Sequence, residues 1–319
     1  EQRCSEQLLL MVNREMRALV VEVPTLLTTF ERESGVQLSP EQCQAIKAAA
    51  TAAVLIVTGG PGTGKTTLIR SIIKLYDEAG MRILLAAPTG RAAKRIEEQA
   101  GKPASTIHRL LEYSPRERRF LRDAEDPLDC DGLIIDELSM VDVTLLDAVL
   151  AAVPRHCRLL LVGDSDQLPS VGPGNVLADL INAGICPITR LTTVFRQGDR
   201  SAIVMAAHMV NHGHVPQSKD GELGDYFFVS RPDRLAARNT IVHLVSQRIS
   251  DRFGLDPLTD IQVLTPMNRG ELGTSALNRD LQAALNPAGA EIEGASGIRV
   301  GDRVMQTRNN YQLEVFNGD

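Results

Sequence analysis

The chain has 319 residues, of which 43% are apolar, 23% charged and 3% aromatic, so it can bury a sizeable core and is longer than one typical domain. Its 25 glycines and 16 prolines are near average use, and no apolar run approaches the roughly 18 residues that cross a bilayer, which excludes disordered, collagen-like and membrane-spanning classes. The formal net charge of −6 argues against a basic coat that binds nucleic acid everywhere, so any polyanion site must be a local groove.

The cysteines point to a reducing compartment. They are Cys4, Cys43, Cys130, Cys157 and Cys186. They are odd in number and far apart, and no CxxC pair or nearby histidine accompanies them, so the sequence encodes neither a zinc site nor a disulfide framework. We expect a cytoplasmic location. The first residue is Glu1 and not Met, and we expect the chain to be part of a longer protein.

Residues 1–36 are predicted to form a helical accessory segment. Apolar side chains from Leu8 to Val20 follow a loose helical stripe, which Pro24 should end or redirect.

Residues 37–190 read as one α/β domain. Short aliphatic runs at 54–57, 83–86, 133–135 and 159–162 are bounded by turn residues, as is typical of buried parallel strands. Amphipathic helical patterns lie between them, so the repeated unit is βαβ and the sheet is doubly wound. Residues 109–130 interrupt the alternation and are predicted to be a small insertion.

Residues 191–319 are predicted to begin a second α/β domain. Helical patterns precede a predicted strand at 261–264, and the last residues form neither a helix cap nor a closing strand. This second domain is therefore expected to be incomplete.

The strongest motif is GGPGTGKT at residues 59–66, which follows a predicted strand and precedes a predicted helix, as a P-loop requires. The glycines turn backbone N–H groups toward one anion, Lys65 reaches the β and γ phosphates, and the Thr66 hydroxyl binds Mg²⁺. The alternative is a glycine-rich turn without a ligand. The predicted ligands are Mg²⁺ and a nucleoside triphosphate, ATP or GTP, and the family resemblance described below selects ATP.

Two carboxylates end the third aliphatic run. In a P-loop fold, Asp136 would bind Mg²⁺ and Glu137 would activate the attacking water. An acidic helix N-terminus is the alternative reading. Polar residues at 163–171 follow the next strand, where they could sense the γ-phosphate, and Arg196 stands where it could act as an arginine finger.

The ordered series of motifs resembles superfamily 1 helicases, and among them the RecD-like group, which contains the exodeoxyribonuclease V alpha subunit and stand-alone relatives. The resemblance covers residues 36–319 and implies a P-loop NTPase with tandem RecA-like domains. It makes Gln42 the adenine-reading residue, extends the phosphate loop to Thr67, makes Gln167 the phosphate sensor and matches Arg196 to the arginine of the fourth motif. Residues 301–319 resemble the start of a small barrel insert. The implied nucleotide-binding residues are Gln42, Gly59, Gly60, Pro61, Gly62, Thr63, Gly64, Lys65, Thr66 and Thr67.

Two segments resemble the family's strand-binding motifs. Their predicted DNA contacts are Pro88, Thr89, Gly90, Arg91, Thr106 and His108. The alternatives are that Thr89 caps a helix and that His108 is a satisfied, partly buried side chain. Residues 109–122 hold five arginines beside Tyr113 and Phe120, which favours either stacking on bases or a solvated charged face.

The resemblance implies an ATP-dependent helicase that moves 5′ to 3′ on single-stranded DNA in recombination or double-strand break repair, with other exodeoxyribonuclease V subunits as candidate partners and no membrane. The sequence shows no cluster of carboxylates beyond the magnesium motif that could cut DNA, so the chain is not expected to be a nuclease itself. RNA stays open as a substrate, because stacking and phosphate contacts do not read the 2′-hydroxyl. The alternative from another class is a nucleotide-dependent switch that binds a protein partner without moving along DNA.

Overall fold

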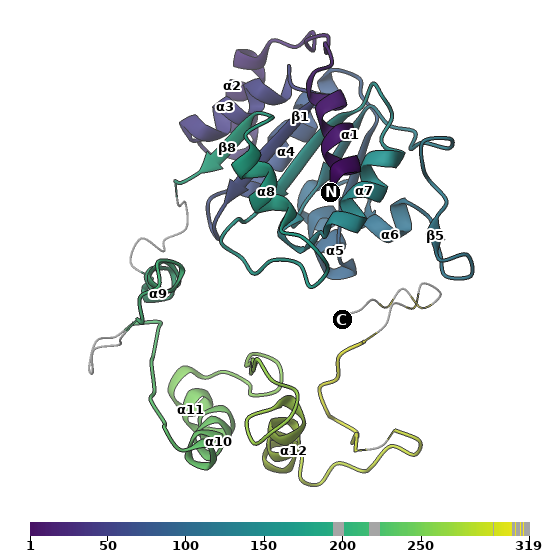
Figure 1. Ribbon diagram of the computed structural model, residues 1–319. Coiled ribbons are helices and arrows are strands. Elements are labelled where there is room, and N and C mark those ends of the chain that lie inside the picture. Colours follow the sequence, from purple (N-terminus) through teal and green to yellow (C-terminus); the bar gives the residue numbers. More distant parts are fainter. Residues whose placement is uncertain are drawn as a thin grey trace. The chain divides into compact units, whose positions relative to one another are not determined.

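The computed structural model describes residues 1–193, 201–216, 224–295, 297–307, 310, 313 and 315 (Figure 1). Contacts divide the chain into two compact units, Glu1–His214 with Thr307–Asp319, and Val215–Gln306. The boundary predicted at residue 191 stays a prediction, since contacts alone divide the chain at residue 215.

The first unit is built on one parallel sheet of six strands, in the order β3-β2-β6-β7-β1-β8. The strands are β1 (Val54–Gly59), β2 (Ile83–Ala87), β3 (Ala104–Thr106), β6 (Gly132–Ile135), β7 (Arg158–Gly163) and β8 (Ile188–Leu191). The predicted α/β class is confirmed, as are the four predicted strands. The two edge strands, β3 and β8, were not predicted from the sequence.

Helices cover both faces of this sheet, because successive strand residues point to opposite sides. In β1, Val54 and Ile56 pack into one core, and Leu55 and Val57 into the other. The first core is completed by α1 (Gln2–Val12), α7 (Val143–Ala152) and α8 (Val176–Ala183). The second is completed by α2 (Val23–Ser34), α3 (Pro40–Ala49), α4 (Lys65–Glu78) and α5 (Gly90–Ala100).

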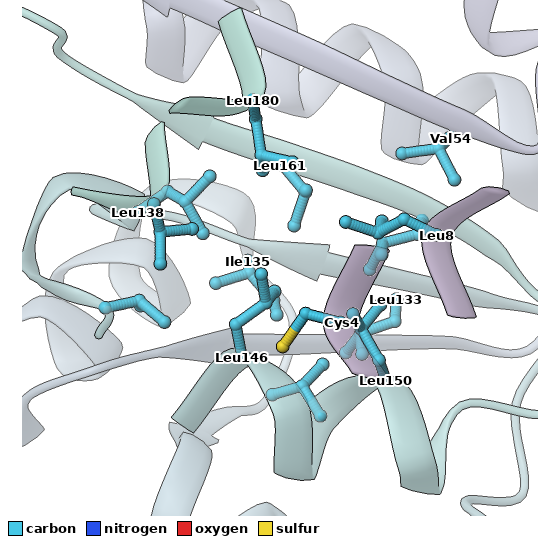
Figure 2. Close-up of a cluster of buried hydrophobic side chains, with 14 of the residues drawn as sticks. Cys4, Leu8, Val54, Leu133, Ile135, Leu138, Leu146, Leu150, Leu161 and Leu180 are labelled. Carbon is cyan, nitrogen blue, oxygen red and sulfur yellow. The ribbon is translucent and has the colours of Figure 1, made fainter. Parts of the chain in front are cut away.

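The N-terminal helix α1 belongs to the first core. Figure 2 shows Cys4 and Leu8 of α1 among leucines of β6 and α7, with Leu133, Leu146 and Leu150 beside them. The predicted accessory segment therefore contributes to both cores, with α1 in the first and α2 in the second.

The effect predicted for Pro24 is wrong. The first helix has already ended at Val12, and Pro24 lies in the first turn of α2, where its missing N–H costs no helical hydrogen bond. The connection between the two helices is held by the buried Arg158, whose guanidinium donates to the carbonyls of Arg17 (2.5 Å) and Ala52 (2.8 Å).

A short helix, α6 (Ile107–Leu110), and a two-stranded hairpin follow β3. The hairpin pairs β4 (Tyr113–Ser114) with β5 (Arg119–Phe120), and Arg118 in its turn has a φ of 54°. Ring contacts join His108 to Tyr113 and to Phe120, with centroids 5.7 and 5.6 Å apart.

The helix α9 (Ala202–Asn211) falls within the first unit. The regular elements described in the second unit are helices. They are α10 (Arg234–His243), the π-helical turn η3 (Leu244–Arg248), α11 (Ile249–Phe253) and α12 (Thr274–Leu285). Single antiparallel bridges join Glu291 to Arg299 and Asn310 to Val315.

The strand predicted at 261–264 is wrong. This segment is irregular, no strand of the described residues pairs with it, and the Leu264 side chain is 88% exposed. A short apolar run does not reveal whether a neighbouring strand is present to complete its hydrogen bonds. Among the described helices of both units, none is long and apolar enough to span a membrane.

Candidate active site

The candidate site lies at the carboxyl edge of the first sheet. The strands β6, β7, β1 and β8 are neighbours in that order, and all are parallel. The segments that follow them therefore emerge side by side, although they come from residues 136–137, 164–167, 60–64 and 192–193. Ligand sites of open α/β sheets form at such an edge.

The loop after β1 has the form of an anion site. Gly62 and Gly64 adopt φ values of 79° and 81°, which a side chain disfavours, and α4 begins at Lys65. The Lys65 ammonium donates to the carbonyls of Gly59 (2.5 Å) and Gly60 (3.0 Å). The Lys65 ammonium is thus held by two backbone carbonyls of the loop. Charged phosphate oxygens are stronger acceptors than carbonyls and could replace them as partners of Lys65.

Gly59 is required by a close approach. A Cβ atom there would lie 2.9 Å from the Cβ and carbonyl oxygen of Leu191 and 2.7 Å from the Thr63 hydroxyl. The end of β8 is therefore packed directly against the start of the phosphate loop.

Asp136 and Glu137 end β6, as predicted. The Glu137 N–H donates to Asp136 Oδ1 at 2.9 Å. Burial raises the pKa of Asp136; the hydrogen bond from Glu137 N–H opposes this, the Glu137 charge adds to it, and the charges of Lys65 and Arg95 lower the pKa again. Lys65 thus helps to keep Asp136 ionised.

Glu137 has a φ of 55°, a left-handed conformation that is strained for a residue with a side chain. The neighbouring 3₁₀ turn η1 (Leu138–Met140) begins directly after it. Such strain is often found at functional residues.

The segment after β7 is organised by Asp164, a buried carboxylate. It accepts from Asp166 N–H at 3.0 Å and from Gln167 Nε2 at 3.3 Å. The side chain predicted to sense phosphate is thus held at this edge by a hydrogen bond.

Thr58, which the sequence analysis did not single out, joins this segment to β1. Its hydroxyl accepts from Ser165 N–H at 3.1 Å and forms a hydrogen bond with the Ser165 hydroxyl at 3.2 Å. The Thr58 side chain is 2% exposed. This pair connects the strand that carries the phosphate loop to the segment predicted to sense phosphate.

Gln42 is buried in the first turn of α3. Its Oε1 accepts from Ser39 N–H (2.9 Å), its own N–H bonds to the Ser39 hydroxyl (3.2 Å), and its Nε2 donates to the Gly64 carbonyl (3.1 Å). Gln42 therefore joins α3 to the phosphate loop, and its adenine-reading role stays a prediction.

The oxygen donors predicted for Mg²⁺ suit that ion, which prefers carboxylate and hydroxyl oxygen together with phosphate oxygens. The donors are the Asp136 carboxylate, whose raised pKa is opposed in part by the charge of Lys65, and the Thr66 hydroxyl, which donates here to Gln99 Oε1 at 3.1 Å. Thr67 lies in the same first turn of α4. Ligation by Thr66 would replace its contact with Gln99.

The predicted DNA-contacting threonines both cap helices. Thr89 accepts from Ala92 N–H at the start of α5, and Thr106 accepts from Arg109 N–H at the start of α6, each at 3.2 Å. Pro88, Gly90 and Arg91 adjoin Thr89, so these residues share the sheet edge with the phosphate loop. Their contacts with DNA stay predictions.

His108 lies in the aromatic cluster of the hairpin. Desolvation there lowers its pKa, and the charge of Asp142 opposes the shift. Arg196 lies outside the described residues, so its place relative to the phosphate loop stays a prediction.

Comparison with known families gives two matches. Residues 42–173 match the family described as an AAA domain, and residues 277–319 match the SH3 domain of ATP-dependent RecD-like DNA helicases. The first match contains the phosphate loop and the segments after β6 and β7.

Relatives that match most of the chain include two bacterial proteins. The ATP-dependent RecD2 DNA helicase of Deinococcus radiodurans is 41% identical over 282 residues, which cover 88% of this chain and 37% of the relative. The RecBCD enzyme subunit RecD of Mycolicibacterium smegmatis is 32% identical over 88% of this chain and 56% of the relative. The chain thus spans between about a third and three fifths of these relatives' length.

Among solved structures, the Pif1 helicase of Candida albicans is 24% identical, with a TM-score of 0.44 over 65% of this chain and 55% of that chain. A Bacteroides Pif1 helicase in complex with ADP-AlF3 and single-stranded DNA is 22% identical, with a TM-score of 0.40 over 71% of this chain and 58% of that chain.

Proposed function

The chain belongs to the RecD-like group of superfamily 1 DNA helicases, and on that premise we propose that it is the ATP-hydrolysing part of a DNA helicase. The observation that carries the proposal is the sheet edge at which the Lys65 loop, Asp136 with Glu137, and the Asp164–Gln167 pair emerge from three neighbouring strands. An anion site beside two carboxylates is what phosphoryl transfer to water requires.

Each residue has a role that follows from its place. The Lys65 ammonium would exchange its carbonyl partners for β- and γ-phosphate oxygens. The Asp136 carboxylate and the Thr66 hydroxyl would hold Mg²⁺, which supplies charge neutralisation on the phosphates when bound. Glu137 would accept a proton from the attacking water, and Gln167 and Arg196 would contact the γ-phosphate.

The DNA part of the proposal rests on the relatives, whose names specify a DNA helicase and a RecBCD subunit. We propose single-stranded DNA as the track, with contacts at residues 88–91, 106 and 108, and 5′ to 3′ movement in recombination or break repair. Exodeoxyribonuclease V-type subunits are the proposed partners, and the cytoplasm is the proposed location.

Steady-state ATP hydrolysis with and without a single-stranded oligonucleotide tests the proposal. The protein should be the longest natural form that carries this chain, beside its Lys65→Ala variant. We expect DNA to stimulate hydrolysis and Lys65→Ala to reduce the rate by at least about 100-fold, because it removes the charge that positions the phosphates.

The matched control is Lys74→Ala, which removes a lysine of the same helix that pairs with Glu33 and should leave hydrolysis unchanged. Hydrolysis that requires Lys65 but ignores DNA would contradict the helicase proposal and favour a nucleotide-dependent switch.

A further inference from the structure

Two consecutive residues of α3 contact two different segments: Gln42 contacts the phosphate loop, and Glu41 contacts the residues that follow β8. Gln42 bonds to the Gly64 carbonyl, at the residue that precedes α4. Glu41 contacts Thr192 and Thr193, which directly follow β8. One helical turn therefore joins the nucleotide loop to the place where the chain leaves the sheet.

The Glu41 contact has the geometry of a specific clamp. Its Oε1 accepts from the Thr192 hydroxyl at 2.9 Å, and both of its carboxylate oxygens lie 3.2 Å from the Thr193 hydroxyl. Hydroxyl groups that donate to a carboxylate form stronger hydrogen bonds than neutral pairs. Two neighbouring residues are thus held by one anion, 151 and 152 residues away in sequence.

Glu41 is ionised near neutral pH. Hydrogen bonds from the Ser39 hydroxyl, from its own backbone N–H and from the Thr192 hydroxyl lower its pKa to about 2. The strength of the contact therefore does not vary near neutral pH.

The surroundings give this contact a short path to the nucleotide. Leu191, the residue before Thr192, packs so closely on Gly59 that a Cβ atom would not fit between them. Gly59 also offers its carbonyl to Lys65. A shift of the phosphate loop on ATP binding would thus displace residues 191–193 through the packing of Leu191 on Gly59. It would also displace Glu41, because α3 is bonded to the loop through Gln42.

We propose that Glu41 is a positioning residue that fixes residues 192–193 against α3 and the phosphate loop, so that movement of the loop reaches the chain as it leaves the first sheet. The inference rests on the proposed function and deepens it. It assigns Glu41 to coupling between ATP hydrolysis and DNA unwinding, and it assigns the residue no contact with ATP or DNA.

The test compares variants in the longest natural form of the protein. We expect Glu41→Ala to keep its KM for ATP within about twofold of the unmodified protein, while base pairs unwound per ATP hydrolysed fall about fivefold, as suits the loss of a charged hydrogen bond. The paired variant Thr192→Val with Thr193→Val should give the same loss. Combining all three changes should add little, because residues that act through one contact are not additive.

Conservative variants separate coupling from folding. Thr192→Ser with Thr193→Ser keeps both hydroxyls and should restore unwinding per ATP, and Glu41→Gln, which keeps one acceptor oxygen, should be intermediate. Glu33→Ala removes a carboxylate whose partner is Lys74 and should have no effect. Thermal unfolding of each variant shows whether the fold is retained.

Three outcomes would overturn the inference: unwinding per ATP that is unchanged in Glu41→Ala, a KM for ATP that rises as the main effect, or fully additive losses in the combined variant. Failure of the proposed function looks different, because hydrolysis by the unmodified protein would then not respond to DNA or would not depend on Lys65.

Discussion

Asp136 is a carboxylate whose burial opposes its charge. Burial raises its pKa, so the native state favours the protonated form and the ionised form lowers the free energy of unfolding near neutral pH. This cost is relieved as the pH falls through the raised pKa of the folded state. The site thus keeps a charge where nucleotide and Mg²⁺ can use it, at the expense of stability.

The first prediction at this scale is that Asp136→Asn stabilises the protein. Without nucleotide and Mg²⁺, the melting temperature should rise by about 2–4 °C, which corresponds to roughly 1 kcal/mol in a unit of this size. ATP hydrolysis by the same variant should fall by about 100-fold, because the metal loses its charged ligand. Calorimetry in EDTA and a steady-state assay with Mg²⁺ measure the two effects.

Asp129→Asn is the control, because Asp129 is exposed and pairs with the exposed Arg82. Its melting temperature and rate should match those of the unmodified protein. A lower melting temperature for Asp136→Asn would contradict the argument from burial.

The sequence indicated the identities of single site residues better than their contacts. The glycines and Lys65 of residues 59–66 have the geometry that their motif predicts. Glu41 and Thr58 were missed, because their partners lie 151 and 107 residues away and no local pattern records such a contact. For Thr89 and Thr106 the sequence could not distinguish a helix cap from a nucleic-acid contact, because both use the same residue types.

At the scale of secondary-structure elements, Thr58 connects β1 to the segment after β7. If Thr58→Val removes the hydroxyl, Ser165 N–H loses its acceptor beside a buried side chain. We expect the free energy of unfolding to fall by about 1–3 kcal/mol. Urea denaturation, followed by circular dichroism, measures it.

Thr58→Ser keeps the hydroxyl and should recover most of the lost stability, although it removes one buried methyl group. If Thr58→Val and Thr58→Ser unfold at the same urea concentration, the hydroxyl does not hold the segment after β7.

Buried strands were the elements best predicted from the sequence. The runs at β1, β2, β6 and β7 are aliphatic throughout because both faces of the sheet are covered. The edge strands β3 and β8 lack such runs and were missed. The error at 261–264 has the converse cause, since that segment has apolar side chains but no neighbouring strand among the described residues.

At the scale of the whole molecule, the two hydrophobic cores of the first unit are contained within residues 4–191. The fragment 1–193 holds all six strands and should fold by itself. We expect one cooperative thermal transition, within about 3 °C of the first unit in the longer chain.

This fragment should bind ATP, as measured by calorimetry, and should show no hydrolysis that DNA stimulates. The fragment 13–193, which lacks α1, is the matched control and should melt at a clearly lower temperature, because Cys4, Leu8 and Met11 no longer cover the core. A broad, non-cooperative transition of fragment 1–193 would contradict the prediction.

The docking of α1 on α7 also sets an order of events during synthesis. Cys4 donates to the carbonyl of Val143, 139 residues further along the chain. At a synthesis rate of about 5–20 residues per second, the first helix leaves the ribosome roughly 7–28 s before its docking surface exists. An isolated helix of 11 residues is only marginally stable in water, so this segment stays largely unfolded until α7 has been synthesised. Within the first unit, α1 is therefore synthesised well before α7 and is buried only after α7 has been made.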